Sequence, residues 1–236
     1  MTEIDDVRVE VVRGEMQPWS DTAQPGLPPT GGAVVCRLLA DLLPSTGRTL
    51  VVGPHGRDVI DLVAARSTHV TVLLRSVSDA RELAAAVAGG NIEVISGALD
   101  GLAGRAVEAY DAIVAVDGLD RVLGADSPDL SWPERLAQLL KHAAADAILA
   151  VGLENGCSLT ALLDRRGDDE RHGDNEWWPL RDDVQRPTSA DAFAEAVQRA
   201  GVGGTACDAA FSAAGVPHTL VRIESLADAL PGTLTS

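Results

Sequence analysis

Aromatic side chains and cysteines are scarce in this chain of 236 residues. Phe, Trp and Tyr together make up 3% of the sequence, whereas hydrophobic residues make up 46%. The interior must therefore be built from Val, Leu, Ile and Ala, which favours layered helices and parallel strands over an aromatic-rich β-sandwich. Cys36, Cys157 and Cys207 lie far apart without C-x-x-C spacing, and the histidines lack metal-ligand spacing. We therefore expect neither a disulfide framework nor a metal site.

Positive charge is also scarce. The chain has 19 Lys and Arg residues against 35 Asp and Glu residues, so its formal net charge is -16. A nucleic-acid-binding protein needs an excess of cations to release counterions from the phosphate backbone, which excludes nucleic acid as a partner. The sequence has no run of about 18 apolar residues and no long apolar segment at its N-terminus. We expect a soluble cytoplasmic protein that does not bind a membrane.

The prolines and charges divide the chain into an arm and one domain. Prolines and a glycine in QPWSDTAQPGLPPT, residues 17–30, oppose regular structure, which predicts an N-terminal arm over residues 1–29. Residues 30–236 suit a single domain, because doubly wound domains commonly exceed 200 residues. Within it, RRGDDERHGDNEWWPLRDDVQRP has no periodicity and many charges. This segment predicts an acidic lid loop around residues 165–188.

Apolar strands and helical segments alternate from residue 49 onward. The strand-like segments TLVVG, HVTVLL, IEVISG, YDAIVAV and AILAVGLE are separated by helical ones such as RDVIDLVAA and WPERLAQLLKHAA. Strands that are apolar throughout and separated by helices indicate βαβ units and a parallel sheet covered on both faces. Near the C-terminus, GTACDAAFSA and HTLVRIES flank a short turn and predict an antiparallel hairpin.

This order of elements resembles the class I S-adenosylmethionine-dependent methyltransferase family over roughly residues 30–225. The resemblance implies an α/β, Rossmann-like, doubly wound and mostly parallel sheet of seven strands, in the order 3-2-1-4-5-7-6, with an antiparallel C-terminal hairpin. The segments GPHGRDVIDLVAA, YDAIVAVDGLDRV and AILAVGLENGCSL are also similar to methyltransferase-like proteins of actinobacterial natural-product pathways. The resemblance further implies S-adenosylmethionine as cofactor and methyl transfer to a small-molecule or peptide acceptor in natural-product biosynthesis.

The resemblance also implies which residues bind the cofactor. The family's glycine-rich turn after its first strand corresponds to residues 53–56, the glycine turn, which has two of the usual three glycines. The family's second strand ends in an acid that binds both ribose hydroxyls, but Leu74 and Arg75 stand there, with Asp79 an alternative acid a few residues on. The implied cofactor-binding residues are Gly53, Pro54, His55, Gly56, Leu74, Arg75, Ala98, Leu99, Asp117 and Gly118.

Candidate catalytic and substrate-binding residues follow the later strands and the acidic lid. Methyl transfer needs a base where the acceptor must lose a proton, and the candidates are Asp117, His55 and Glu154. The candidate substrate-binding residues are Trp19, Trp177, Trp178 and Asp120, with anchoring to the core as the other role for the tryptophans. Cys157 is interpreted as a small buried hydrophobe. The acidity of the lid favours a cationic acceptor.

Purely structural roles and two other functions stay open. The glycine turn can serve only to join a strand to a helix, and Asp117 can serve only as a loop cap. Without the ribose acid, the fold can act as a catalytically inactive binding or assembly subunit that partners another pathway enzyme or forms a homodimer. As a third alternative, Arg75 stands where an NADP-dependent reductase binds the 2′-phosphate. However, Tyr110 and Lys141 lie too far apart in sequence for the Tyr-x-x-x-Lys pair of such enzymes.

Overall fold

The computed structural model of the protein describes residues 9–23, 28–87, 90–105, 108–155, 163, 183–213 and 215–228. Within them, six strands form one sheet in the order β1-β4-β3-β2-β5-β6, and all five pairings are parallel. The bounds are β1 Glu10–Val11, β2 Arg48–Val52, β3 His69–Leu74, β4 Ile92–Ser96, β5 Tyr110–Ala115 and β6 Ala143–Val151. The prediction of a doubly wound, mostly parallel α/β sheet is confirmed.

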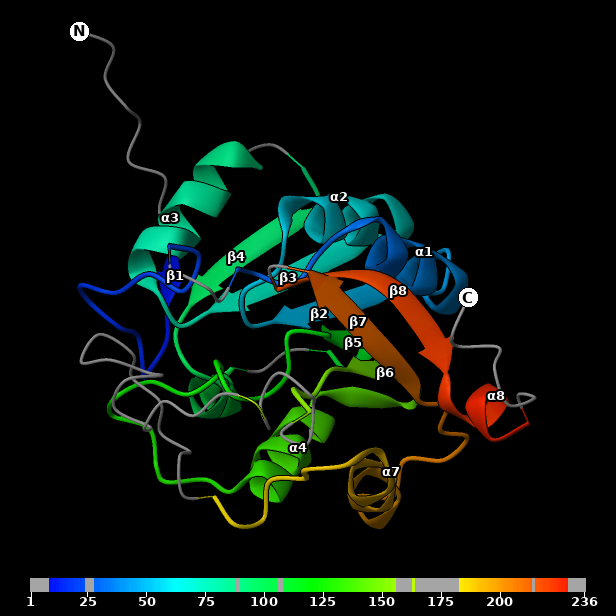
Figure 1. The fold of residues 1–236 in the computed structure, drawn as a ribbon. Helices are drawn as coiled ribbons and strands as arrows, with labels where there is room; N and C mark the ends of the chain where they lie inside the picture. The colour runs from blue at the N-terminus through cyan, green and yellow to red at the C-terminus, as the bar shows by residue number, and fades with distance from the viewer. Residues whose placement is uncertain are drawn as a thin grey trace, which may run out of the picture.

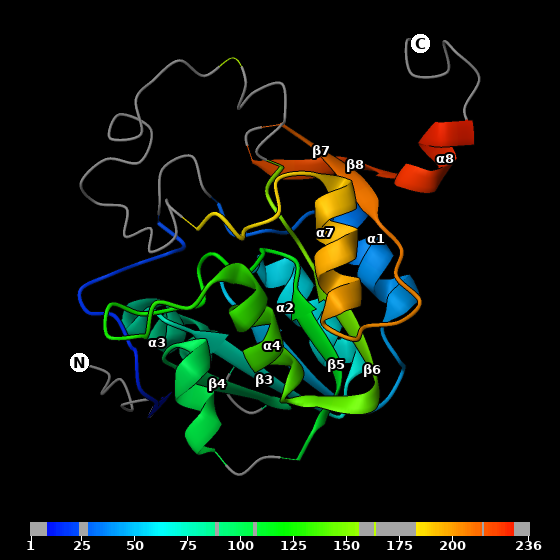
Figure 2. The same ribbon diagram turned by 90° about the horizontal axis from the view of Figure 1, so that it is seen from below.

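Helices cover both faces of the sheet, as Figures 1 and 2 show. One face packs against α1 (Ala33–Leu42), α2 (Arg57–Arg66) and α3 (Val77–Ala86). The other packs against the 3-10 helix η1 (Leu99–Gly104), α4 (Trp132–Leu140) and α7 (Ala190–Arg199). The middle strands have to be apolar on both faces for this reason, and residues 49–52 of β2 are all buried.

The C-terminal hairpin forms but lies outside the main sheet. Strands β7 (Asp208–Ala213) and β8 (Val216–Arg222) pair antiparallel in a separate two-stranded sheet, followed by α8 (Ile223–Asp228). The predicted order placed the last strand between two others, whereas β8 contacts α1 instead (Figure 1). Pro217 in β8 has no N–H to donate, which disfavours a central position in a sheet. Within the described residues, the main sheet therefore has six strands instead of the predicted seven.

The N-terminal segment is tied to the sheet. β1 extends the sheet beyond β4, with Glu10 opposite Ile95 and Val11 opposite Ser96. Two isolated parallel bridges follow, one between Met16 and Ser76 and one between residues 30 and 55. The segment before α1 thus runs along the ends of the strands. Trp177, Trp178 and Cys157 lie outside the described residues, as does most of the predicted lid.

Candidate functional site

The carboxyl ends of β2 and β5 form the candidate site. The chain passes from β2 to β3 and β4 in one direction across the sheet, and returns to the other side of β2 for β5 and β6. Ligands of open parallel sheets bind outside the carboxyl ends of the strands at such a reversal. The chain has a Rossmann-like α/β fold. In this Rossmann-like domain the glycine turn follows β2, and Asp117 and Gly118 follow β5.

Two different constraints place glycine in the glycine turn. Gly53 has φ +85°, a conformation that L side chains rarely adopt, and its N–H donates to the carbonyl of Leu73 at 3.0 Å. Gly56 has an ordinary φ of -58° and begins α2 as its N-cap. A Cβ atom there would lie 3.3 Å from the Cα of Gly31. Gly56 therefore lets the N-terminal segment approach the turn.

The N-terminal segment accepts a hydrogen bond from a backbone N–H of the glycine turn. The N–H of Gly56 donates to the carbonyl of Thr30 at 2.9 Å. The same segment approaches the end of β4, where the N–H of Ala98 donates to the carbonyl of Arg13 at 3.0 Å. The N–H of Leu99 donates to Val122 at 2.8 Å. These backbone donors are thus already bonded within the protein.

His55 is buried in the glycine turn, with 5% of its surface exposed. Its Nδ1 lies 2.9 Å from the carbonyl oxygen of Gly53, and its Nε2 has no hydrogen-bond partner among the described residues. Burial lowers the pKa of His55, and the nearby Arg121 lowers it further, although the Asp117 carboxylate and the Gly53 hydrogen bond oppose this shift. The imidazole is therefore neutral near pH 7, and its Nε2 is available to accept a hydrogen bond or a proton from another group.

Acidification should destabilise the wild type more steeply than the His55→Gln variant. Because burial lowers the folded-state pKa of His55, the unfolded chain takes up a proton that the folded chain does not. Its contribution is complete above about pH 6.5, the unfolded value, and falls below it by up to ~1.4 kcal/mol per pH unit. Urea denaturation at a series of pH values measures the slope. Burial also lowers the pKa of His142, so the slope of His142→Gln is measured as well, to separate the contribution of that histidine from the contribution of His55. Equal slopes in the wild type and H55Q would contradict the assignment.

Asp117 is engaged in an ion pair instead of standing free as a base. Arg121 donates from Nε to Oδ2 of Asp117 at 2.8 Å and from Nη2 to Oδ1. The hydroxyl of Thr30 donates to Oδ1 at 2.9 Å. The Asp117 side chain is only 2% exposed, so its carboxylate faces protein groups. Asp117, His55 and the glycine turn do come together, as the parallel edges predicted.

Arg75 holds an acid at the end of β3, where the resemblance implies that the strand itself should supply one. Its Nε and Nη2 donate to the two carboxylate oxygens of Asp21 at 2.9 and 2.6 Å, and its Nη1 donates to the Leu123 carbonyl at 3.1 Å. The guanidinium also lies over the ring of Trp19 at 5.6 Å. Both charged side chains are at most 3% exposed. The Arg75 guanidinium, which a reductase would offer to a 2′-phosphate, is therefore already bonded to the Asp21 carboxylate.

Asp79 binds the N-terminal segment as well. Its carboxylate accepts hydrogen bonds from the hydroxyl of Ser20 at 2.6 Å and the N–H of Asp21 at 2.7 Å. Thr22 donates to it from both its N–H and its hydroxyl, at 3.1 and 3.0 Å. The resemblance offers Asp79 as an alternative ribose acid, but nothing in the sequence indicates a role for Asp21 or Arg121 at this edge. Arg75 in the place of an acid was the one signal that a carboxylate would come from elsewhere.

Asp120 and Glu154 do not join the cluster around Asp117. Asp120 accepts hydrogen bonds from Arg186 Nη2 at 2.8 Å and from Arg135 Nη1 at 3.3 Å. Glu154 is exposed, and its backbone carbonyl accepts from Arg186 at 3.3 Å. The remaining predicted cofactor residues, Pro54, Leu74 and Gly118, are buried at the ends of their strands. The structure thus divides the predicted residues between two polar clusters.

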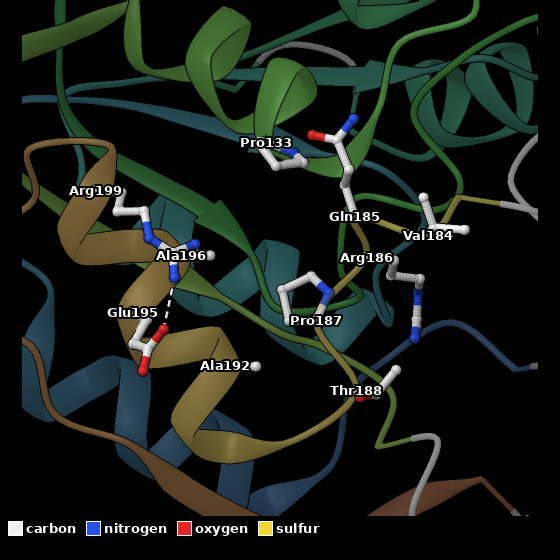
Figure 3. A pocket seen from close by; sticks show the side chains of 10 residues that line it. All are labelled: Pro133, Val184, Gln185, Arg186, Pro187, Thr188, Ala192, Glu195, Ala196 and Arg199. Carbon is white, nitrogen blue, oxygen red and sulfur yellow. Dashed lines mark hydrogen bonds and ion pairs between the residues drawn. The ribbon is translucent and has the colours of Figure 1, made fainter.

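A groove of about 390 Å³ lies between α4 and α7 (Figure 3). It contains none of the predicted site residues, and its charged side chains include the Glu195–Arg199 ion pair of α7. Its lining residues are Pro133, Val184, Gln185, Arg186, Pro187, Thr188, Ala192, Glu195, Ala196 and Arg199. Among the described residues, no group of three His, Cys, Asp or Glu side chains is placed to hold a metal. None of the described helices is long and apolar enough to span a membrane.

No family model and no curated protein matches the chain. Comparison with solved structures finds a similarity to precorrin-8w decarboxylase from Methanobacterium thermoautotrophicum, at 18% sequence identity and a TM-score of 0.39. The similarity covers 53% of this chain and 65% of the other, so this chain spans less than two thirds of that protein. A likeness at this level carries no argument about activity. The fold assignment therefore stands on the strand order itself.

Proposed function

We propose that the protein transfers a methyl group from S-adenosylmethionine to a small-molecule or peptide acceptor in a natural-product pathway. The supporting observation is the glycine turn between β2 and α2, at the reversal point of a sheet in which five adjacent strands have the order β4-β3-β2-β5-β6. The N-terminus of α2 lies at this turn, and a helix N-terminus favours an anionic group such as the methionine carboxylate. The cofactor assignment rests on fold-level analogy.

The cofactor and the N-terminal segment compete for the same groups. With the segment in place, the Gly56 N–H is bonded to Thr30, and Arg75 is bonded to Asp21 where the ribose acid is implied. This closed conformation does not fit a nucleoside. The glycine turn itself offers suitable groups for the cofactor. Departure of the segment would free the Gly56 N–H, and the Nε2 of His55 in the same turn has no hydrogen-bond partner among the described residues. The proposal therefore concerns an open conformation.

The charge of the protein favours an acceptor that carries positive charge. With 35 acidic residues against 19 basic ones, the protein creates a negative potential that attracts cations over long range. An amine or a peptide N-terminus has the required charge. S-adenosylmethionine supplies an electrophilic methyl group when bound, and the neutral imidazole of His55 is suited to accept a proton from such an acceptor.

Calorimetric titration with S-adenosylmethionine and S-adenosylhomocysteine tests the proposal. We expect saturable binding with a dissociation constant below about 1 mM for the wild type. Gly56→Val should abolish it, because in the open conformation the new side chain would stand beside the Gly56 N–H, where we propose that the anionic group of the cofactor binds. Gly104→Val is the matched control, since no atom lies within 4 Å of a Cβ atom placed there. Absence of binding in both the wild type and G104V would overturn the proposal.

A second candidate function is that of a binding or assembly subunit without catalysis. The observation that favours it is the closed conformation, in which segment and scaffold satisfy each other's charges at the strand ends. The hairpin also exposes Phe211 and Val216, by 48% and 41%, which could contact another pathway enzyme or a second copy. Absence of cofactor binding, together with a larger mass in light scattering, would support this function.

A further inference from the structure

We propose that the N-terminal segment is an autoinhibitory strap that competes with ligand for the carboxyl ends of the strands. The strap consists of residues 13–23 and 28–32. The identity of the ligand rests on the proposed function, but the competition itself depends only on the contacts of the strap. It predicts that the protein exchanges between a closed form, described above, and an open form that binds ligand.

The strongest attachment is the ion pair between Asp21 and Arg75. It joins the strap to the end of β3 through two charge-assisted hydrogen bonds of 2.9 and 2.6 Å, with both side chains buried. Arg121 adds hydrogen bonds to the carbonyls of Asp21 and Pro28 at 3.3 and 3.4 Å. The closed form therefore depends on carboxylate and carbonyl groups that lie on the strap and guanidinium groups that lie on the scaffold.

Further attachments block the two places where ligand groups are expected. Asp79, in the first turn of α3, receives hydrogen bonds from Ser20, Asp21 and Thr22. At the glycine turn, the Thr30 carbonyl accepts the Gly56 N–H, the donor that a bound anionic group would need. Closing the strap and binding a ligand at this edge are therefore mutually exclusive.

The strap buries few apolar side chains, which favours its detachment from the sheet. Among its described residues, Met16 alone has a hydrophobic side chain in the buried core. Its other attachments are the contact of the Trp19 ring with the Arg75 guanidinium, and hydrogen bonds and ion pairs that water can replace when a segment opens locally. By contrast, α1 directly after the strap buries Val35 and Leu39. The strap can consequently leave while α1 and the sheet stay folded.

Asp21 could instead be a ligand-binding acid that the strap delivers to the end of β3. Its burial argues against this role. Asp21 is 2% exposed, and each of its carboxylate oxygens is already bonded to Arg75. Its Oδ1 also accepts the indole N–H of Trp19 at 3.1 Å. A ribose has no room to reach it, so the carboxylate acts as a latch.

The test compares the full-length wild type with Asp21→Asn, using hydrogen exchange and calorimetry. Loss of the carboxylate charge should open the strap, so the amide exchange rates of Met16 and Gly56 should rise at least about tenfold. Binding of S-adenosylhomocysteine should tighten by about the same factor, because the binding-competent fraction increases. Asp41→Asn is the matched control, since Asp41 forms an exposed ion pair with Arg37 on α1. Neither quantity should change in D41N.

Several outcomes separate this inference from the proposed function. Unchanged exchange in D21N would overturn the strap, and so would weaker ligand binding in D21N, which would make Asp21 a ligand-binding residue. Faster exchange without any ligand binding would support the strap and refute the cofactor assignment. If D21N does not fold, Thr22→Val removes one hydrogen bond to Asp79 and keeps the ion pair between Asp21 and Arg75, and it should raise exchange of Met16 and Gly56 by a smaller factor.

Discussion

Replacing Arg135 with alanine should lower the free energy of unfolding by about 3–5 kcal/mol, because removing one member of a buried ion pair leaves the carboxylate of Asp183 buried without this cation. Arg135, on α4, is completely buried. Its guanidinium donates to the Leu119 carbonyl, to Asp120 at 3.3 Å and to Asp183 at 3.2 Å. Burial lowers the pKa of Arg135, while Asp120 and Asp183 oppose this shift. One side chain thus joins α4 to the loop after β5 and to the loop before α7.

Urea denaturation followed by circular dichroism measures this effect. Arg199→Ala is the matched control, because Arg199 pairs with Glu195 on the exposed face of α7, where both side chains are more than 60% exposed. Exposed pairs of this kind contribute about 0–1 kcal/mol, so R199A should lie close to the wild type. A loss of less than about 1 kcal/mol in R135A would contradict the role of Arg135 as a buried link between α4 and the two loops.

The parallel sheet could be predicted because its signals are local. Strands β2 to β5 are buried over most of their length and therefore read as mainly apolar segments between helical ones, and right-handed crossovers then leave few topologies. The same logic brought the glycine turn, His55 and Asp117 to one edge, since the carboxyl ends of parallel strands meet there. Strand order therefore predicts that these residues share an edge, whereas the roles proposed for them come from the resemblance.

The position of the hairpin and the path of the N-terminal segment could not be predicted in the same way. The short turn between β7 and β8 predicts a hairpin but does not indicate which other element the hairpin packs against, and β8 packs on α1. The pairing of Asp21 with Arg75 joins residues 54 positions apart, across a segment whose prolines and glycine indicated only irregular structure. No residue near Asp21 or Arg75 in the sequence indicates that these two side chains form an ion pair.

The central claim is that the strap has to leave before ligand binds, and a reversible lock should abolish binding almost completely. The bridge between Met16 and Ser76 offers a position for a disulfide, because both residues are buried and their backbones are paired. Paired strand residues usually lie within the Cα separation that a disulfide needs. The variant is Met16→Cys with Ser76→Cys, in a background where Cys36, Cys157 and Cys207 are replaced by serine.

Ser76 also accepts the N–H of Asp79 as the N-cap of α3, so its replacement should cost about 1 kcal/mol of stability in both redox states. Comparing the oxidised and reduced forms of the same variant cancels that cost. The most direct measurement is calorimetric titration of both forms with S-adenosylhomocysteine. The account predicts that the oxidised form binds at least about tenfold more weakly than the reduced form. Equal affinity in the two forms would contradict it.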